Sequence, residues 1–221
     1  MKPVPQLRVV ENVLETLCPL SFYVELPEDL GGLSLPATLR QWLQPDPLQP
    51  FPFPRSEELR QQVRNSLRPY GYKPTGRGKP ASEYLVSAFE KGFLSPTDGI
   101  NAAVDLCNLT SFHSGLPISV VDAELLNGEL TIAWCPPDTR YPFNPSGQLI
   151  DASGLVALCD GSGVSGTPVK DSQRTKTRPE TTTLLTILWA PSVAETHGRS
   201  VLQWYLEQHQ LLGWSTKELK L

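Results

Sequence analysis

The chain has 221 residues, of which 39% are hydrophobic and 19% charged, and its formal net charge is −4. This composition is that of a folded domain and excludes a largely disordered chain or a coiled coil. No stretch approaches the roughly 18 uncharged apolar residues that a membrane-spanning helix needs, and the N-terminus, with Pro3 and Pro5, begins no apolar signal-peptide core. We therefore expect a cytoplasmic protein that does not bind membranes.

The first 54 residues are set apart by their prolines. Six prolines fall between Gly31 and Pro54, which forbids a helix interior or a central strand there. We expect residues 1–54 to end in a proline-rich arm that packs on a main domain, residues 55–221, through Trp42, Phe51 and Phe53.

Positive charge is concentrated in two later segments. Residues 55–79 carry seven basic residues against two acidic ones, and residues 170–178 carry four basic residues against Asp171. In the first segment, Ser56 as an N-cap predicts a helix over residues 57–67. Three arginines repeat on one face of this helix at every fourth position: Arg60, Arg64 and Arg68.

A loop over residues 70–80 follows, in which aromatic and basic residues alternate. This mixture suits RNA, because bases stack on rings and phosphates bind cations, but it is also common in ordinary surface loops. A solvated helix face and a phosphate-binding surface both remain open. The candidate RNA contacts are Arg64, Arg68, Lys73, Arg77, Lys79, Arg174 and Lys176.

The rest of the chain predicts helices and strands in mixed order. Helices are expected over 83–91, 101–112 and 201–210, with Ser82 capping the first and Gly115 ending the second. Strands are expected over 116–122, 129–134, 148–151, 154–159 and 181–189, with a hairpin turn at Asn127-Gly128 and a loop over 160–177. No regular βαβ rhythm is present, so the fold class is α+β.

Cysteine and histidine are too scattered to predict a metal site. The cysteines form no CxxC pair and lie in apolar contexts, so we expect buried free thiols. The three histidines form neither an HExxH motif nor a pair at helical spacing, and no GxSxG motif is present. The sequence thus predicts no metal and no organic cofactor.

Four blocks of sequence share their order and spacing with a known family. They are residues 72–75 with 80–85, Asn101 with 107–109, 114–118 with Asp122, and 174–176 with 180–181. From about Arg68 to Trp189 the chain resembles the editing domain of the phenylalanyl-tRNA synthetase beta subunit, the B-three/B-four tRNA-binding domain, and is most similar to its free-standing relatives. The resemblance implies a three-layer α+β fold with a β-sandwich-like mixed sheet and flanking helices, which hydrolyses a wrongly attached amino acid from the 3′ end of tRNA.

The resemblance also implies a place for the site, between the helix that bears Asn108 and the strand after Gly115-Leu116-Pro117. Asn108 matches an asparagine that orients the aminoacyl group. Ser119 stands where the synthetase domain has a histidine, and Ile187 stands where it has a glutamate. The segment 159–163 replaces an alanine-glycine turn, so the amino-acid pocket differs and tyrosine specificity is not carried over.

An aminoacyl ester needs a positioned water and donors for the oxyanion more than it needs a strong base. The catalytic candidates are Asn108 and Ser119, as hydrogen-bonding groups, and Asp122, as a proton acceptor or orienting group. Structural roles stay open for Asn108, as a tie between helix and strand, and for Asp122, as a turn or cap residue. The expected substrate pocket comprises Ser111, Gly115, Pro117, Asp160, Gly161 and Gly163.

Two functions follow from these observations. The first is a trans-acting aminoacyl-tRNA deacylase, and the second is a non-catalytic tRNA-binding or RNA-binding module that has lost the editing chemistry. The expected partner is tRNA in both cases. For the segment around Arg174, a contact to the tRNA end and a buried ion pair both remain open.

Overall fold

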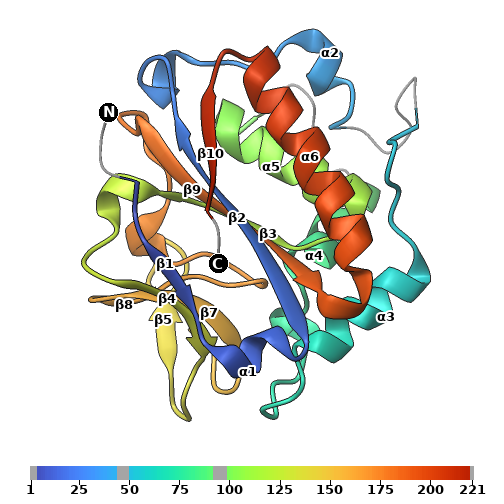
Figure 1. Cartoon of the computed structure of the whole chain (residues 1–221), viewed down its shortest axis with the longest axis vertical. Helices are drawn as coiled ribbons and strands as arrows, with labels where there is room; N and C mark the ends of the chain where they lie inside the picture. Colours follow the sequence, from blue (N-terminus) through green and yellow to red (C-terminus); the bar gives the residue numbers. More distant parts are fainter. Residues whose placement is uncertain (1–3, 44–49, 92–98, 220–221) are drawn as a thin grey trace.

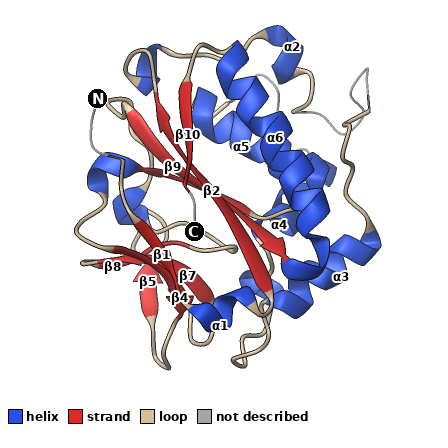
Figure 2. Cartoon of the chain, viewed as in Figure 1, coloured by secondary structure: helices blue, strands red, loops and turns tan. Residues whose placement is uncertain are grey.

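The computed structural model describes residues 4–43, 50–91 and 99–219. Two four-stranded β-sheets and a group of helices form three successive layers. The helices lie on the right in Figure 1, and the sheet that contains β1, β4, β7 and β8 lies at the lower left (Figure 2). The expected α+β class, with a mixed sheet and flanking helices, is confirmed. Among the described residues, no helix combines the length and the apolar character needed to cross a membrane.

The middle layer is an antiparallel sheet in the order β10-β2-β9-β3. Its strands are β10 (Ser215–Leu219), β2 (Leu17–Glu25), β9 (Thr183–Pro191) and β3 (Ile118–Asp122). The outer sheet has the order β1-β4-β7-β8 and is mixed, because β1 runs parallel to β4. Its strands are β1 (Leu7–Val9), β4 (Leu130–Trp134), β7 (Val156–Asp160) and β8 (Gly163–Gly166), and a separate hairpin pairs β5 (Arg140–Pro142) with β6 (Leu149–Asp151).

The helices cover the other face of the middle sheet. They are α2 (Ala37–Arg40), α3 (Glu57–Ser66), α4 (Ala81–Glu90), α5 (Ala102–Ser114) and α6 (Glu195–Leu211). The short helix α1 (Glu11–Leu14) instead buries Val13 in the core between the two sheets. Successive side chains of β9 point to opposite faces of the sheet, and they therefore contribute to two separate hydrophobic cores. Leu184 and Leu188 pack toward the helices, whereas Ile187 and Trp189 pack toward the outer sheet.

The N-terminal segment is an integral part of this architecture. β2 pairs with β9 over its whole length and with β10 on its other side, so residues before position 54 supply a central strand. The proline-rich arm packs as its aromatic residues indicate: Trp42 stacks on Trp204 at 5.6 Å and Phe51 meets the same ring edge-on at 4.8 Å. Pro45 and Pro47 lie outside the described residues.

Three local expectations are wrong. Ser82 does not cap a helix, because α4 begins at Ala81 with Pro80 at its N-cap and without a side-chain cap. The expected loop over 160–177 contains the strand β8. The Asn127-Gly128 turn does not join a hairpin, because the strands on either side of it, β3 and β4, belong to different sheets. Gly128 does adopt the left-handed backbone that a turn favours, with φ 72°. The chain between residues 122 and 130 therefore crosses from the middle layer to the outer one.

Candidate functional site

The site begins with the helix that carries Asn108. The Asn101 side chain caps α5 by accepting a hydrogen bond from the Val104 amide at 2.9 Å, and Gly115 ends the helix in the left-handed conformation at φ 79°. Between these ends, Val104 and Asn108 lie four residues apart on one helical face. Both line a cavity of about 290 Å³.

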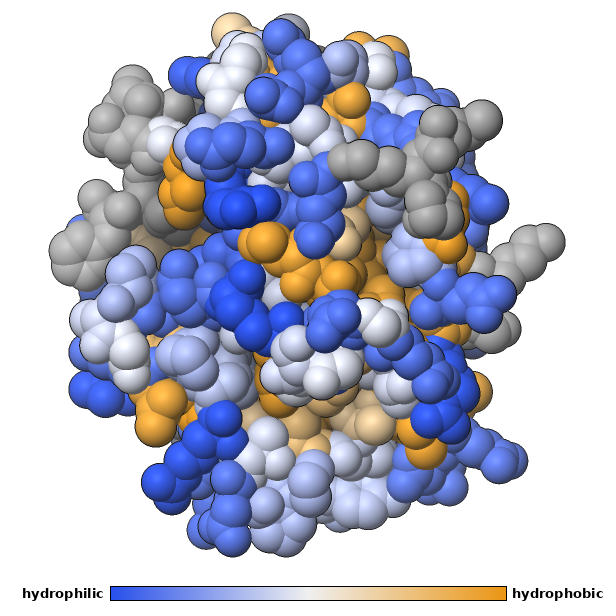
Figure 3. Space-filling view, turned by 90° about the vertical axis from the view of Figure 1, so that its left-hand side faces the viewer, coloured by the Kyte–Doolittle hydropathy of each residue, from blue (hydrophilic) through white to orange (hydrophobic). Residues whose placement is uncertain are grey.

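The cavity is apolar on most sides and polar on one. Strand β3 contributes Ile118 and Val120, and the segment from Thr167 to Thr177 contributes the charged groups. The apolar lining comes from Ala81, Ile100, Val104, Cys107, Ile118, Val120 and Phe143. Figure 3 shows the face on the left of Figure 1, where apolar residues gather in a hollow near the middle and hydrophilic residues surround it. A few convergent polar groups in an apolar cavity are typical of ligand sites.

Asp171 is the most strongly perturbed acid at this site. Its carboxylate accepts hydrogen bonds from the Val120 and Thr167 amides, both at 3.3 Å. Burial raises the pKa of Asp171 to about 7, against the lowering effects of the Ser119 hydroxyl, the two amides and Lys176. A carboxyl group with this pKa exchanges a proton at neutral pH, which an ordinary aspartate does not.

Two lysines stand near Asp171 without forming an ion pair with it among the described residues. Lys176 donates a hydrogen bond to the Phe143 carbonyl at 2.7 Å, and the Lys170 ammonium lies 4.0 Å from the centre of the Phe143 ring. Burial lowers the pKa of both lysines. The negative charge of Asp171 offsets part of the lowering for Lys176. Repulsion by Lys176 and Arg77 lowers the pKa of Lys170 further. The ammonium groups are thus held in place by the ring and carbonyl of Phe143.

Asn108 completes the constellation. It is half-buried, it lines the same cavity, and its side-chain amide has no hydrogen-bond partner among the residues that the structure describes. An amide in this state can donate to one group of a ligand and accept from another.

A second cavity of about 390 Å³ adjoins the first, and Phe143 and Lys170 line both. It brings together Lys73 and Arg77 from the aromatic and basic loop, with Asp151 as an acidic neighbour. The two basic segments of the sequence, around residues 73–79 and 170–176, therefore meet in space. Together the two cavities form an apolar chamber beside a cationic groove.

The expectation that Ser119 points into the Asn108 cavity is wrong. Successive residues of β3 face opposite sides of the sheet, and Ile118 and Val120 take the cavity side. Ser119 is buried on the other side, where it accepts a hydrogen bond from the Trp189 indole at 2.9 Å. Its hydroxyl donates its one proton to the Thr167 carbonyl at 3.1 Å or to Asp171. Ser119 therefore contacts residues that line the cavity without lining it itself.

Asp122 has a structural environment. Its fully buried carboxylate accepts hydrogen bonds from the Glu124 amide at 2.9 Å and the Thr181 hydroxyl at 2.8 Å, and it pairs with Arg178 at 3.3 Å. Asp122 thus has the capping role that the sequence left open as an alternative to catalysis. It does not line the Asn108 cavity.

The expected pocket residues are dispersed. The Ser111 hydroxyl donates to the Leu116 carbonyl at 2.7 Å, and the Pro117 carbonyl accepts from the Trp189 amide at 3.0 Å. Gly115 lines a different cavity. Residues 160–163 form the turn between β7 and β8, so the expectation that Gly161 and Gly163 wall the Asn108 cavity is wrong.

The candidate RNA contacts divide into paired and available cations. Arg64 forms two hydrogen bonds with Glu83, at 2.7 and 2.6 Å, and Arg174 binds Asp160 at 3.0 and 2.6 Å. Lys79 donates to Ser87 at 2.9 Å, and Arg68 remains on the surface with a bond to Asn65 at 2.7 Å. Lys73, Arg77 and Lys176 are the candidates that line the two adjoining cavities.

The sequence singles out the polar and basic block 171–176 as a functional segment but gives Asp171 no role of its own, and it does not single out Lys170. The available signal was their place in the second basic segment, next to Arg174-Thr175-Lys176. No family model matches this chain, and no curated protein matches it either.

Proposed function

We propose that this protein is a trans-acting deacylase that hydrolyses the ester between an amino acid and the 3′ end of a tRNA. The observation that carries the proposal is that one apolar cavity is lined both by Asp171, with a pKa raised to about 7, and by Asn108, whose side-chain amide has no hydrogen-bond partner in the described part of the chain. The resemblance of residues 68–189 to the tRNA-editing domain supplies the substrate class.

The cavity offers the groups that ester hydrolysis needs. Asp171 takes a proton from a water molecule as its oxygen attacks the carbonyl carbon. Asn108 donates its amide hydrogen to the oxyanion that develops. The bond between the carbonyl carbon and the ribose oxygen then breaks, and Asp171 returns the proton to that oxygen, which leaves a free amino acid and an uncharged tRNA.

The lysines and the adjoining groove bind the nucleic acid in this proposal. Lys170, Lys73 and Arg77 line the groove next to the chamber, where they suit the phosphates of a single-stranded 3′ end. The Phe143 ring between the two cavities offers a face on which a base can stack. The amino acid then enters the apolar chamber while its nucleotide stays outside.

The test is single-turnover hydrolysis of mischarged aminoacyl-tRNA. We expect Asp171→Asn to slow deacylation by about 10²- to 10⁴-fold, the usual contribution of a general base, and Asn108→Ala by roughly 10- to 1000-fold, as for an oxyanion donor. Affinity for tRNA should stay unchanged in both variants, because neither change removes a cation.

Asp138→Asn is the matched control, since it makes the same chemical change at an exposed position outside the chamber. Full activity in Asp171→Asn would disprove the assigned mechanism. A wild-type protein that binds tRNA but deacylates no mischarged tRNA would instead favour the non-catalytic RNA-binding module.

A further inference from the structure

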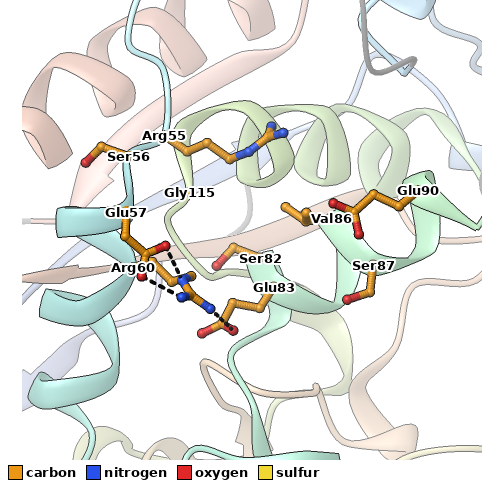
Figure 4. Close-up of a pocket in the computed structure, with 10 residues that line it drawn as sticks. All are labelled: Arg55, Ser56, Glu57, Arg60, Ser82, Glu83, Val86, Ser87, Glu90 and Gly115. Atoms are coloured by element: carbon orange, nitrogen blue, oxygen red, sulfur yellow. Dashed lines mark hydrogen bonds and ion pairs between the residues drawn. The ribbon is translucent and has the colours of Figure 1, made fainter.

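A third cavity, distinct from the chamber and the groove, lies between the start of α3, the length of α4 and the end of α5. It has a volume of about 430 Å³, and Figure 4 shows its lining. Arg55 projects over it from one side and Glu90 from another, with Ser82 and Val86 between them (Figure 4). None of its lining residues belongs to the other two cavities.

Arg55 is fixed in position but retains free donors. Its guanidinium lies 4.2 Å from the centre of the Phe112 ring and donates through Nη1 to the Phe112 carbonyl at 3.0 Å. Its Nε and Nη2 groups have no partner in the described part of the chain. A planar fork with two unused donors matches the geometry of a carboxylate.

Glu90 provides the opposite charge. It is exposed at the end of α4 and raises the pKa of Arg55, which burial lowers. The two groups do not approach within ion-pair distance among the described residues. Their charges therefore face a shared space that a ligand can span.

The remaining charges of the cavity cancel within the protein. Arg60 pairs with Glu57 and Glu83 (Figure 4). Glu83 also pairs with Arg64, which lies outside the cavity lining. These pairs leave one positive and one negative group, which disfavours a phosphate dianion and favours a ligand that carries both charges.

Ser82 is an independent indication of a ligand. The residue is only 4% exposed and lines the cavity. No hydrogen bond of its hydroxyl is found within residues 4–43, 50–91 and 99–219, and the oxygen is not among the fully buried atoms without a partner, so it remains accessible from the cavity that the residue lines. A polar ligand atom in the cavity would satisfy this group.

We infer that this cavity is a binding site for a free α-amino acid, whose carboxylate binds Arg55 and whose ammonium group binds Glu90. Ser82 supplies a third hydrogen bond. Of the described residues that line the cavity, Val86 is the one with a large apolar side chain, so the site suits amino acids with small or polar side chains, such as glycine and serine.

The test is an NMR titration of the ¹⁵N-labelled full-length protein with glycine and with L-serine. We expect saturable shifts of the amide signals of residues 55–57 and 82–90. N-acetylglycine lacks the ammonium group and glycinamide lacks the carboxylate, so each should bind at least tenfold more weakly than glycine. Inorganic phosphate should not compete.

Three variants test which side chain binds which charge of the ligand. Arg55→Gln and Glu90→Gln should each raise the Kd for glycine at least tenfold, and Arg55→Lys, which keeps the charge, should raise it less than Arg55→Gln. Arg68→Gln and Glu58→Gln are matched controls outside the cavity and should leave the Kd unchanged. Absence of saturable shifts, equal binding of glycinamide, or an unchanged Kd in Arg55→Gln would overturn the inference, and none of these results bears on the deacylase site.

Discussion

Asp122, which is fully buried, and Asp171, which is half-buried and lines a cavity, differ in their hydrogen bonds. Asp122 receives a backbone amide, a hydroxyl and a guanidinium, so its negative charge is compensated on several sides. Asp171 receives two amides at 3.3 Å and contacts no guanidinium among the described residues. Burial without full compensation favours the neutral acid, which accounts for the raised pKa of Asp171.

The raised pKa of Asp171 predicts a pH dependence of stability. The group titrates near 3.8 when unfolded and at about 7 when folded, so between these values the folded state binds more protons. Its contribution to stability is present in full below about pH 4 and is lost as the pH rises through 7. The loss is at most about 4 kcal/mol at 1.4 kcal/mol per pKa unit, and solvent in the cavity reduces it.

Urea denaturation at several pH values between 4 and 8 measures this contribution as the difference between wild type and Asp171→Asn. The difference is needed because His209, with a pKa lowered to about 4 by burial, has the opposite sign. Asp171→Asn should become more stable relative to wild type as the pH rises, and Asp138→Asn should follow wild type. Parallel curves for wild type and Asp171→Asn would contradict the prediction.

At the scale of elements, the end of α5 depends on Gly115. Its φ is 79°, and a Cβ added there would lie 2.8 Å from the Cβ of Arg55 and 3.3 Å from Leu59. Gly128 has a similar φ of 72° but open space around it. Both glycines avoid backbone strain, and Gly115 also permits close packing of α5 against α3.

Gly115→Ala should therefore destabilise the protein more than Gly128→Ala. The left-handed backbone alone costs about 1–2 kcal/mol for a residue with a Cβ, and the clash with Arg55 adds to this cost at position 115 only. Thermal unfolding of the two variants measures the difference. Equal destabilisation would show that Arg55 moves aside without cost.

Local signals in the sequence predicted the helices well. Ser56 caps α3 and Gly115 ends α5 as expected, whereas Ser82 lies inside α4 and does not cap it. Sheet order depends on distant partners, so the sequence did not show that β2 lies beside β9 or that β3 and β4 belong to different sheets. The alternating pattern of a strand also does not say which of its two faces lies toward the helices and which toward the other sheet. For this reason Ser119 was assigned to the wrong face of β3.

The same limit applies to the site. Asn108 was accessible to sequence reasoning because the resemblance and the helical pattern both include it. The properties of Asp171 arise from partners such as Val120, 51 residues away. Burial of this kind is created by the fold, and no local pattern encodes it.

In the folded molecule some basic residues come together in one groove, whereas others are paired with acidic residues. The two basic segments come together where Lys73, Arg77 and Lys170 line one groove. Other cations of the same segments are neutralised, since Arg64 and Arg174 pair with Glu83 and Asp160. The number of basic residues in the sequence therefore overstates the positive charge that is available to bind a polyanion. Lys73, Arg77 and Lys170 are available and lie together in the groove.

This distribution predicts how tRNA binding should respond to salt. Each phosphate that a lysine or arginine neutralises on a single strand contributes about 0.7 to the slope of log K against log salt. The triple variant Lys73→Ala, Arg77→Ala and Lys170→Ala should thus lower the slope by up to about 2. The matched control removes three cations outside the groove: Arg8, Arg199 and Lys217. Binding measured between low and moderate salt should show the smaller slope in the groove variant alone, because counterions are released only where phosphates are bound. Equal slopes in the two triple variants would mean that tRNA, if it binds at all, responds to the net charge of the protein and not to this groove.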